Sequence, residues 1–523
     1  MIDELDDRIV GLMRQLVART PTPPDLTAPV AEAIFSDGEH RNGAIVEDAG
    51  GATGVVVPLT SRRTLRAVAI LVAAAACLIG LVVLTNRPTR TIPVSPPTPP
   101  TWATVPDPTG TFRAPTGAEV TSPGPDEAPV SPNGITLSDV AMTSLGMFAV
   151  GSEQSAHTSV AAVWRSPDGS SWSRIPHDPT VFGALQSARD PSTTEGYGMN
   201  QIVEFGGILV AVGGRFESHV LQPGEPGYPG SASTSSPVVW TSGDGERWST
   251  QTLPLPDGIS STVMAVAAGT NGLMAVGSTY QVDTKTVVAE AWYSPDGTTW
   301  SLESVPQASG HAYDGLSANA IAAYGNDFIV AGSDNGRATS WISHDGSSWS
   351  AARLPDGIED DSEVSSVRSL ATSNGHLVAL GWIRSPETVG VGSSSDTGLA
   401  ESTGHSAIAV WYSDDGNVWT RATVRGLADD QFAYVGPLAG GPSGFVGATR
   451  LFVEHRFVEA TISSTDGETW AIAPSALQGP RSAVAATPAG WVAVGSEVDY
   501  ITPGQGVDPA RVPENASVWI AAD

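Results

Sequence analysis

One seven-residue pattern, Ser-x-Asp-Gly-x-x-Trp, occurs six times between Ser166 and Trp470. Eight residues before each closing Trp lies another large apolar residue, which is Trp in five copies and Ile462 in the sixth. This fixed offset indicates one β-hairpin used repeatedly, with Asp-Gly at its turn, because Asp accepts hydrogen bonds from turn amides and Gly readily adopts a positive φ. The copies consist of Ser166, Asp168, Gly169 and Trp172; Ser242, Asp244, Gly245 and Trp248; Ser294, Asp296, Gly297 and Trp300; Ser343, Asp345, Gly346 and Trp349; Ser413, Asp415, Gly416 and Trp419; and Ser464, Asp466, Gly467 and Trp470.

A second repeated feature is a short apolar run that closes on Gly. One such run precedes each copy of the heptad and another follows the last copy, so that seven runs extend from 149–151 to 493–495. Long repeats made of several short strands are typical of β-propellers. The sequence therefore predicts an all-β fold, a seven-bladed β-propeller of four-stranded blades, over residues 135–523.

The heptad resembles the Asp-box, or BNR, repeat of sialidase-like and sortilin-like propellers, in a variant in which Asp and Gly are adjacent. The resemblance covers about residues 135 to 523. It implies a propeller in which each box is a structural turn at the rim. It does not identify a ligand, because one fold carries many activities.

The composition limits the class of partner. The chain has 523 residues and a net charge of −29, from 55 acidic and 26 basic residues. Such a surface repels phosphate backbones, which argues against a nucleic-acid partner. The single cysteine, Cys77, excludes an internal disulfide.

The N-terminal part is expected to lie on the cytoplasmic side of a membrane. Residues 1–20 have apolar side chains at a helical period and acidic residues near the start, which predicts a short amphipathic helix that ends at Thr20-Pro21. Such a helix has no core of its own. A cytoplasmic partner at residues 1–20, signalling through that helix, and marginal order all stay open. Residues 21–66 are expected to form a flexible cytoplasmic segment.

A single transmembrane helix is expected over residues 67–85. No charged residue occurs from Ala67 to Leu84, and a helix of that length spans about 27 Å, close to the thickness of a bilayer core. More than 60 residues precede it, which disfavours a cleaved signal peptide. The sequence predicts a single-pass protein of the cell membrane with a cytoplasmic N-terminus and an extracytoplasmic propeller.

A Pro-rich linker follows at residues 86–134, and thirteen prolines lie between 88 and 133. Such a composition favours an extended spacer. Within it, residues 101–106 are similar to the strand that follows a box. Because the chain ends after the third strand of the seventh repeat, we expect either that this segment supplies the missing outer strand or that Trp102 belongs to the spacer.

The expected loops differ in length between the two faces of the ring. The turns on the box face are short, whereas long insertions at 176–198, 214–237, 384–406 and 497–516 belong to the opposite face. Loops on a rigid scaffold carry binding functions. The candidates for that binding face are the aromatic residues Tyr197, Tyr280, Tyr313 and Tyr500.

Two classes of function stay open. The family resemblance implies a sialidase-like glycoside hydrolase, which needs an arginine cluster for the substrate carboxylate. Among the expected inner strands only Arg368 and the flanking Arg481 suit that role, and alanine and valine dominate there. The first hypothesis is therefore a non-catalytic recognition or scaffolding module for an extracytoplasmic protein or glycan, and no metal or cofactor is expected. The glycosidase is the alternative.

Overall fold

The computed structural model describes residues 44–46, 55–57, 98–107, 109–113, 134–154, 158–183, 193–221, 231–256, 259–281, 286–306, 316–357, 364–384, 406–427, 433–453, 456–475, 479–496 and 515–522. The chain divides into two compact units, Met1–Val94 and Ser95–Asp523. In the first unit, β1 (Ala44–Val46) pairs antiparallel with β2 (Val55–Val57).

The helices expected at 1–20 and 67–85 lie outside the described residues. Within the described ranges, no helix combines the length and the apolar character that crossing a bilayer requires.

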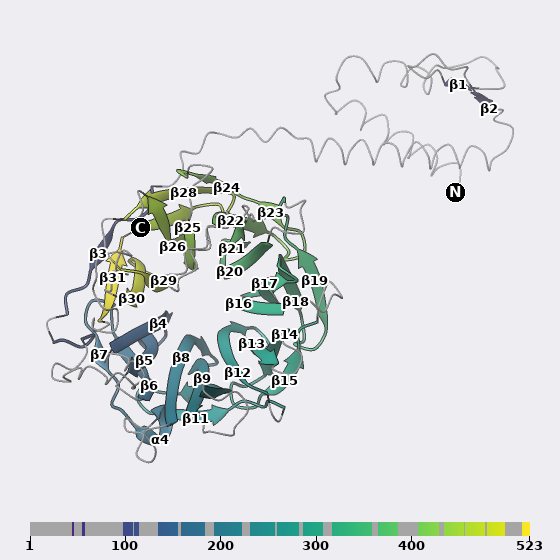
Figure 1. The fold of residues 1–523 in the computed structure, drawn as a ribbon. Coiled ribbons are helices and arrows are strands. Elements are labelled where there is room, and N and C mark those ends of the chain that lie inside the picture. Colours follow the sequence, from purple (N-terminus) through teal and green to yellow (C-terminus); the bar gives the residue numbers. More distant parts are fainter. Residues whose placement is uncertain are drawn as a thin grey trace, which may run out of the picture. The chain divides into compact units, whose positions relative to one another are not determined.

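The second unit is all-β and propeller-like, with short antiparallel sheets arranged around a centre (Figure 1). Its described strands form seven strand groups, numbered here in chain order. Group 1 comprises β4 (Gly134–Thr143), β5 (Gly146–Gln154), β6 (Thr158–Ser166) and β7 (Ser173–Arg174), and group 2 comprises β8 (Thr193–Phe205), β9 (Ile208–Val220), β10 (Ser231–Ser242) and β11 (Ser249–Thr252). Group 3 comprises β12 (Ser261–Gly269), β13 (Gly272–Gln281), β14 (Thr286–Ser294) and β15 (Ser301–Ser304), and group 4 comprises β16 (Leu316–Tyr324), β17 (Asp327–Asp334), β18 (Arg337–Ser343) and β19 (Trp349–Arg353).

The remaining groups follow the same order. Group 5 comprises β20 (Val364–Ser373), β21 (His376–Arg384), β22 (Ser406–Ser413) and β23 (Thr420–Arg421). Group 6 comprises β24 (Thr423–Arg425), β25 (Ala433–Gly441), β26 (Gly444–Val453), β27 (Arg456–Ser464) and β28 (Thr469–Pro474), and group 7 comprises β29 (Arg481–Thr487), β30 (Gly490–Ser496), β31 (Ala516–Ala521) and β3 (Trp102–Thr104). The short helix α4 (Pro179–Phe182) follows β7.

The first long strands of successive groups contact one another in order, from β4 through β8, β12, β16, β20 and β25 to β29, and β29 contacts β4. The second strand of each group is buried on both faces; Phe148 in β5 and Val330 in β17, for example, are fully buried. Strands packed on both faces read as continuous apolar runs, which explains the repeated runs in the sequence.

The Gly that closes these runs has a steric cause. The first strand of each group contains a β-bulge, and in six groups the Gly lies beside it. A Cβ added there would come within 1.8 to 2.1 Å of a carbonyl oxygen of the bulged strand, for example Thr136 O at Gly151 and Ser317 O at Gly332. Glycine is therefore required because the two backbones approach too closely for any side chain.

Two pairings depart from the expected four-stranded pattern. Thr158 and Ser159 of β6 pair in parallel with Glu195 and Gly196 of β8, which joins groups 1 and 2 into one eight-stranded sheet. In group 6, β24 pairs in parallel with the outer strand β28 and adds a fifth strand. Both pairings join segments from successive repeats, so the pattern within one repeat does not predict them.

The segment near Trp102 lies against the last strand of the chain. β3 pairs antiparallel with β31, with Trp102 opposite Ala521, which is the pairing expected if this segment supplies the outer strand. Trp102 Nε1 donates to Thr461 Oγ1 at 2.9 Å, as Trp419 Nε1 of the fifth box donates to Ser340 Oγ at 2.9 Å. Thr461 immediately precedes Ile462 as Ser340 precedes Trp341, so Trp102 occupies the place of a box tryptophan.

Candidate functional site

The six box turns share one hydrogen-bonded geometry. In each, the Ser hydroxyl accepts the backbone N–H of the Gly three residues later, at 2.8 to 2.9 Å. The Gly residues have φ between +72° and +83°, the left-handed region that favours glycine. These glycines are Gly169, Gly245, Gly297, Gly346, Gly416 and Gly467.

The box tryptophans close the same turns. In five boxes the indole Nε1 donates to the carbonyl oxygen of the box Gly at 2.8 to 3.4 Å, and the donors are Trp172, Trp248, Trp300, Trp419 and Trp470. Trp349 departs from this pattern, because its buried Nε1 has no hydrogen-bond partner among the described residues. Apart from Trp349, the box Gly and Trp residues thus hold their turns. Of these residues, Trp419 alone also lines the groove described below.

The box aspartates hold the amides that follow them. Asp345 Oδ1, for example, accepts the N–H groups of Ser347 and Ser348 at 2.9 and 2.7 Å. The same bond, from the amide two residues later to the carboxylate, occurs at Asp168, Asp244, Asp296, Asp415 and Asp466.

These bonds explain the ionisation of the box carboxylates. Backbone hydrogen bonds lower the pKa of Asp345, and they likewise lower the pKa of Asp244 and Asp296. The carboxylates therefore act as turn-forming groups. Among the described residues, no three His, Cys, Asp or Glu side chains cluster in a way that could hold a metal ion.

The two arginines of the glycosidase alternative lie in different surroundings. Arg368 is the extra residue of the bulge in β20, and its side chain is exposed. Arg481 is 5% exposed, and its guanidinium lies 5.3 Å from the ring centroids of both Trp102 and Trp519. Burial lowers the pKa of Arg481, and Glu459 opposes that effect. Two aromatic rings thus enclose the Arg481 side chain, whereas Arg368 is open to solvent.

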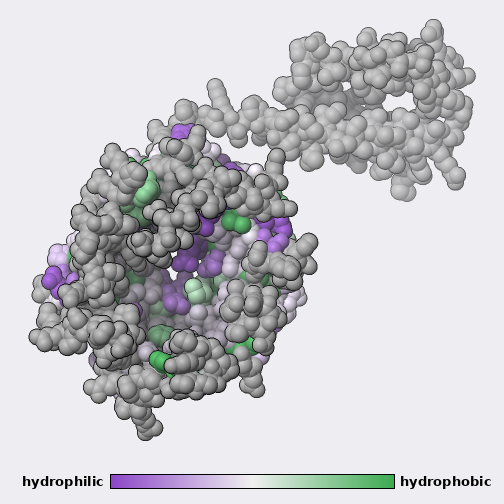
Figure 2. Space-filling model, in the orientation of Figure 1, coloured by the Kyte–Doolittle hydropathy of each residue, from purple (hydrophilic) through white to green (hydrophobic). Residues whose placement is uncertain are grey.

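The aromatic candidates for the binding face are only partly described. Tyr197 is half-buried in β8 and packs in the cluster around Phe182, where burial raises its pKa. Tyr280 belongs to β13, but its side chain lies outside the described residues. Tyr313 and Tyr500 also lie outside them, as do residues 184–192, 222–230, 385–405 and 497–514 of the long insertions. Figure 2 shows hydrophilic residues around a hollow near the centre of the face in view.

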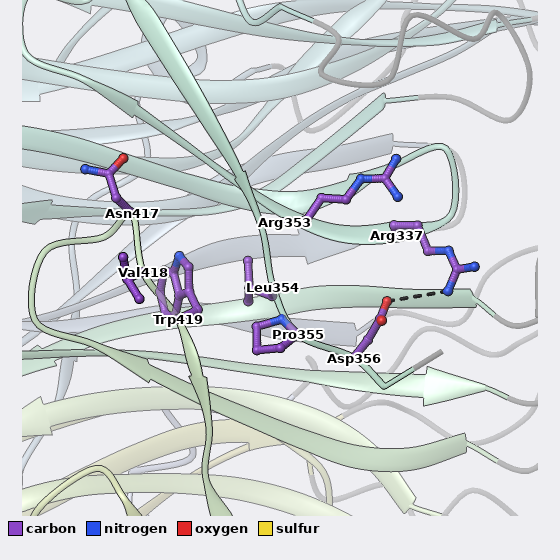
Figure 3. A pocket seen from close by; sticks show the side chains of 8 residues that line it. All are labelled: Arg337, Arg353, Leu354, Pro355, Asp356, Asn417, Val418 and Trp419. Carbon is purple, nitrogen blue, oxygen red and sulfur yellow. Dashed lines mark ion pairs between the residues drawn. The ribbon is translucent and has the colours of Figure 1, made fainter. Parts of the chain in front are cut away.

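A groove of about 450 Å³ lies between group 4 and the box of group 5. Arg337 starts β18 and Arg353 ends β19, and the two lie toward one end, with Asn417 and Val418 toward the other (Figure 3). The full lining is Arg337, Arg353, Leu354, Pro355, Asp356, Asn417, Val418 and Trp419.

The floor of this groove is fixed by hydrogen bonds. Leu354 N donates to Ala338 O at 3.0 Å, and Pro355 O accepts Trp411 Nε1 at 2.7 Å. Trp419 Nε1 donates to Ser340 Oγ and to Gly416 O, both at 2.9 Å. The bonds of Trp411 to Pro355 and of Trp419 to Ser340 join groups 4 and 5, so the walls of the groove are held in place by contacts within the protein.

Arginine predominates among the described charged residues of the groove. Arg337 Nη1 lies 3.7 Å from Asp356 Oδ2, which also accepts Ser365 Oγ at 2.7 Å. The Arg353 side chain is exposed and has no ion-pair partner among the described residues. Arg421 interacts electrostatically with Asp356, and its burial lowers its pKa. Among the described residues that line the groove, two are arginines and one is an aspartate, in a chain whose net charge is −29.

The charged residues of the groove are not among the site residues predicted from the sequence. A signal was present in the repeats: at the end of the outer strand, before the apolar-Pro pair, the fourth copy has Arg353 where the second has Thr252 and the third has Ser304. The first copy has Arg174 there, but its Nε pairs with Glu153 Oε1 at 2.7 Å. Comparison of the copies could have identified Arg353, although not its proximity to Arg337 and to the fifth box.

No protein-family model and no curated protein matches the chain. Among solved structures, the chain is similar to a polysaccharide lyase, an ulvan lyase, with 12% identity over 75% of this chain and 94% of that one, at a TM-score of 0.40. It is also similar to the WD40 repeats of RRP9, with 10% identity over 82% and 99% of the two chains at a TM-score of 0.39. The α-L-arabinofuranosidase Arb93A of Fusarium graminearum gives 11% identity over 74% and 97%, at a TM-score of 0.37. Likeness at these scores carries no argument about activity.

Proposed function

We propose that the chain is a membrane-anchored recognition module that displays a closed, seven-bladed Asp-box propeller outside the cell and binds an extracytoplasmic partner without chemistry. The seven strand groups are its blades. β3, from the linker, completes the last blade, so the propeller is tied to the segment that leads back to the anchor at 67–85.

The observation that supports this proposal most directly is a contrast between two sets of polar side chains, one that contacts groups within the protein and one that is exposed in the groove. The box Ser and Asp side chains hold turn amides, and Arg481 packs between Trp102 and Trp519. The groove between groups 4 and 5 instead combines exposed charge with a fixed floor. An open, preformed polar cleft on a rigid ring suits binding.

The alternative function is a sialidase-like glycoside hydrolase. It requires several arginines that converge on one carboxylate. Arg481 is enclosed by two rings and lies in β29, whereas Arg368 lies exposed in β20. This separation favours the recognition module.

Three measurements test the proposal. The full chain, with an epitope tag before residue 1, is expressed in bacterial cells, which are then converted to spheroplasts and treated with protease. The protease should digest the propeller from outside, while the tag stays protected. The chain should resist carbonate extraction, and a variant that lacks 67–85 should be released. Release of 4-methylumbelliferone from a sialoside by the purified full chain, abolished in Arg368→Ala, would establish the hydrolase instead.

A further inference from the structure

We infer that the groove between groups 4 and 5 binds an extended acidic peptide, with a carboxylate of the peptide held by Arg353 and Arg337. This inference rests on the proposed recognition function and names the class of ligand for it. The groove is defined by the residues that line it, and it involves neither Arg368 nor Arg481.

The described lining of the groove is more basic than the chain as a whole. The chain is strongly acidic overall, yet the described lining of the groove contains the two arginines Arg337 and Arg353 and the single carboxylate of Asp356. Asp356 already lies near Arg337 and accepts the Ser365 hydroxyl. The exposed guanidinium of Arg353 therefore offers donors to an incoming carboxylate, and arginine binds carboxylates with planar, paired hydrogen bonds.

The uncharged part of the lining favours a peptide over an acidic sugar. Val418 is 69% exposed and Pro355 is also exposed, so an apolar side chain of a ligand can pack there. The aromatic residue of the groove, Trp419, is 6% exposed, and both acceptors of its Nε1 lie within the protein. A sugar ring would gain little from it, because stacking requires an exposed aromatic face.

The rim of the ring also shows how an extended segment can bind. In group 6, β24 adds to the outer strand β28 through parallel backbone pairing of Thr423–Arg425 with residues 469–471. The corresponding outer strand in group 4 is β19, which pairs with β18, and no described strand pairs with its other edge. A strand edge with open backbone groups accepts a peptide by strand addition. The groove lies at the end of β19, where Arg353 is its last residue.

The test is a binding titration with the purified full chain in detergent. The probe is a fluorescein-labelled peptide, Thr-Val-Glu-Val-Glu-Thr with an amidated C-terminus, followed by fluorescence anisotropy. We expect saturable binding that is at least about tenfold weaker for the Gln-containing version of the peptide, and about tenfold weaker for the Arg353→Gln variant. Arg337→Gln should also weaken binding. The matched control is Arg247→Gln, which removes one exposed arginine from the box turn of group 2 and should leave the affinity unchanged.

The outcomes separate the alternatives. Equal affinity for the Glu and Gln peptides, or undiminished binding by Arg353→Gln, would overturn the inference. A Gln peptide with a free C-terminus that binds as well as the Glu peptide would identify a terminal carboxylate as the ligand group and support the site. Binding of an oligogalacturonate with the same arginine dependence, and of neither peptide, would replace the peptide by an acidic glycan. A photocrosslinker at Val418 that captures a partner lacking any acidic segment would refute the peptide while leaving the recognition function intact, whereas sialoside turnover would refute the recognition function itself.

Discussion

Replacing Asp139 by Asn should stabilise the protein, and more so as the pH rises. Asp139 lies at the bulge of β4, and its Oδ2 accepts Ile202 N of the neighbouring group at 2.9 Å. Burial raises the pKa of this carboxyl from 3.8 to about 7, although backbone hydrogen bonds from Ile202 and Val140 lower it. The ionised form is thus disfavoured in the folded chain.

Proton linkage determines how the charge of Asp139 changes the free energy of unfolding with pH. Below pH 3.8 the carboxyl is protonated in both states and no penalty exists. Between 3.8 and about 7 the unfolded chain loses the proton while the folded chain keeps it, so the free energy of unfolding falls as the pH rises. Above about 7 the penalty is complete and amounts to at most about 4 kcal/mol. Because the Asp139 side chain is only partly buried, water screens part of this cost, and we expect about 2 kcal/mol at pH 8.

The Asn variant keeps an oxygen to accept the Ile202 N–H, so the change isolates the charge. Urea unfolding of both proteins, followed by far-UV circular dichroism between pH 5 and pH 8, should show an advantage for Asp139→Asn of about 1 kcal/mol or less at pH 5 that grows to about 2 kcal/mol at pH 8. The control is Glu246→Gln, which removes a carboxyl whose side chain is 70% exposed. An advantage that does not change with pH, or a variant less stable than the parent at pH 8, would refute the reasoning.

Two further predictions use matched variants in the same unfolding assay. Gly346→Ala and Gly375→Ala both place alanine at a φ of +82°, but a Cβ at 346 would lie 2.9 Å from the Tyr293 ring whereas nothing lies within 4 Å at 375. We therefore expect losses of about 3 kcal/mol and about 1 kcal/mol, and equal losses would show that the box glycine is needed for its backbone angle alone. Trp102→Ala should lower the free energy of unfolding by about 3 to 5 kcal/mol, whereas Trp102→Phe, which keeps a ring but loses the donor to Thr461, should cost about 1 kcal/mol. A wild-type midpoint for Trp102→Ala would mean that β3 does not support the ring.

The sequence predicts the parts of the fold that repeat. Each heptad supplies its own turn through a Ser hydroxyl, an Asp carboxylate and a Gly with positive φ, and all three act within four residues of one another. The sequence also offers the segment near Trp102 as a possible outer strand, because it is similar to a strand after a box. Local chemistry was sufficient for the turns, whereas the pairing of β3 with β31 decides between the strand and the spacer that the sequence left open for Trp102.

The features that the sequence does not reveal depend on contacts between repeats. Asp139 reads as one acidic residue in an apolar strand until Ile202, 63 residues later, is placed beside it. Arg337 and Arg353 become one site only because the hairpin of β18 and β19 brings them to one end of the groove. The parallel pairing of β24 with β28 likewise joins segments from successive repeats.

The seam between groups 4 and 5 connects binding to stability. Pro355 forms part of the groove, and its carbonyl accepts Trp411 Nε1 across the seam; in the same way Pro254 accepts Trp292, and Pro306 accepts Trp341. A ligand in the groove that contacts Pro355 binds the state in which groups 4 and 5 are packed together, and not the state in which they have separated. Occupancy must therefore stabilise the ring by RT ln(1 + [L]/Kd), about 2.7 kcal/mol at a hundredfold excess over Kd. Because the same seam sets the groove and holds two strand groups together, a substitution that loosens it, such as one at Trp411, should weaken peptide binding without touching the peptide.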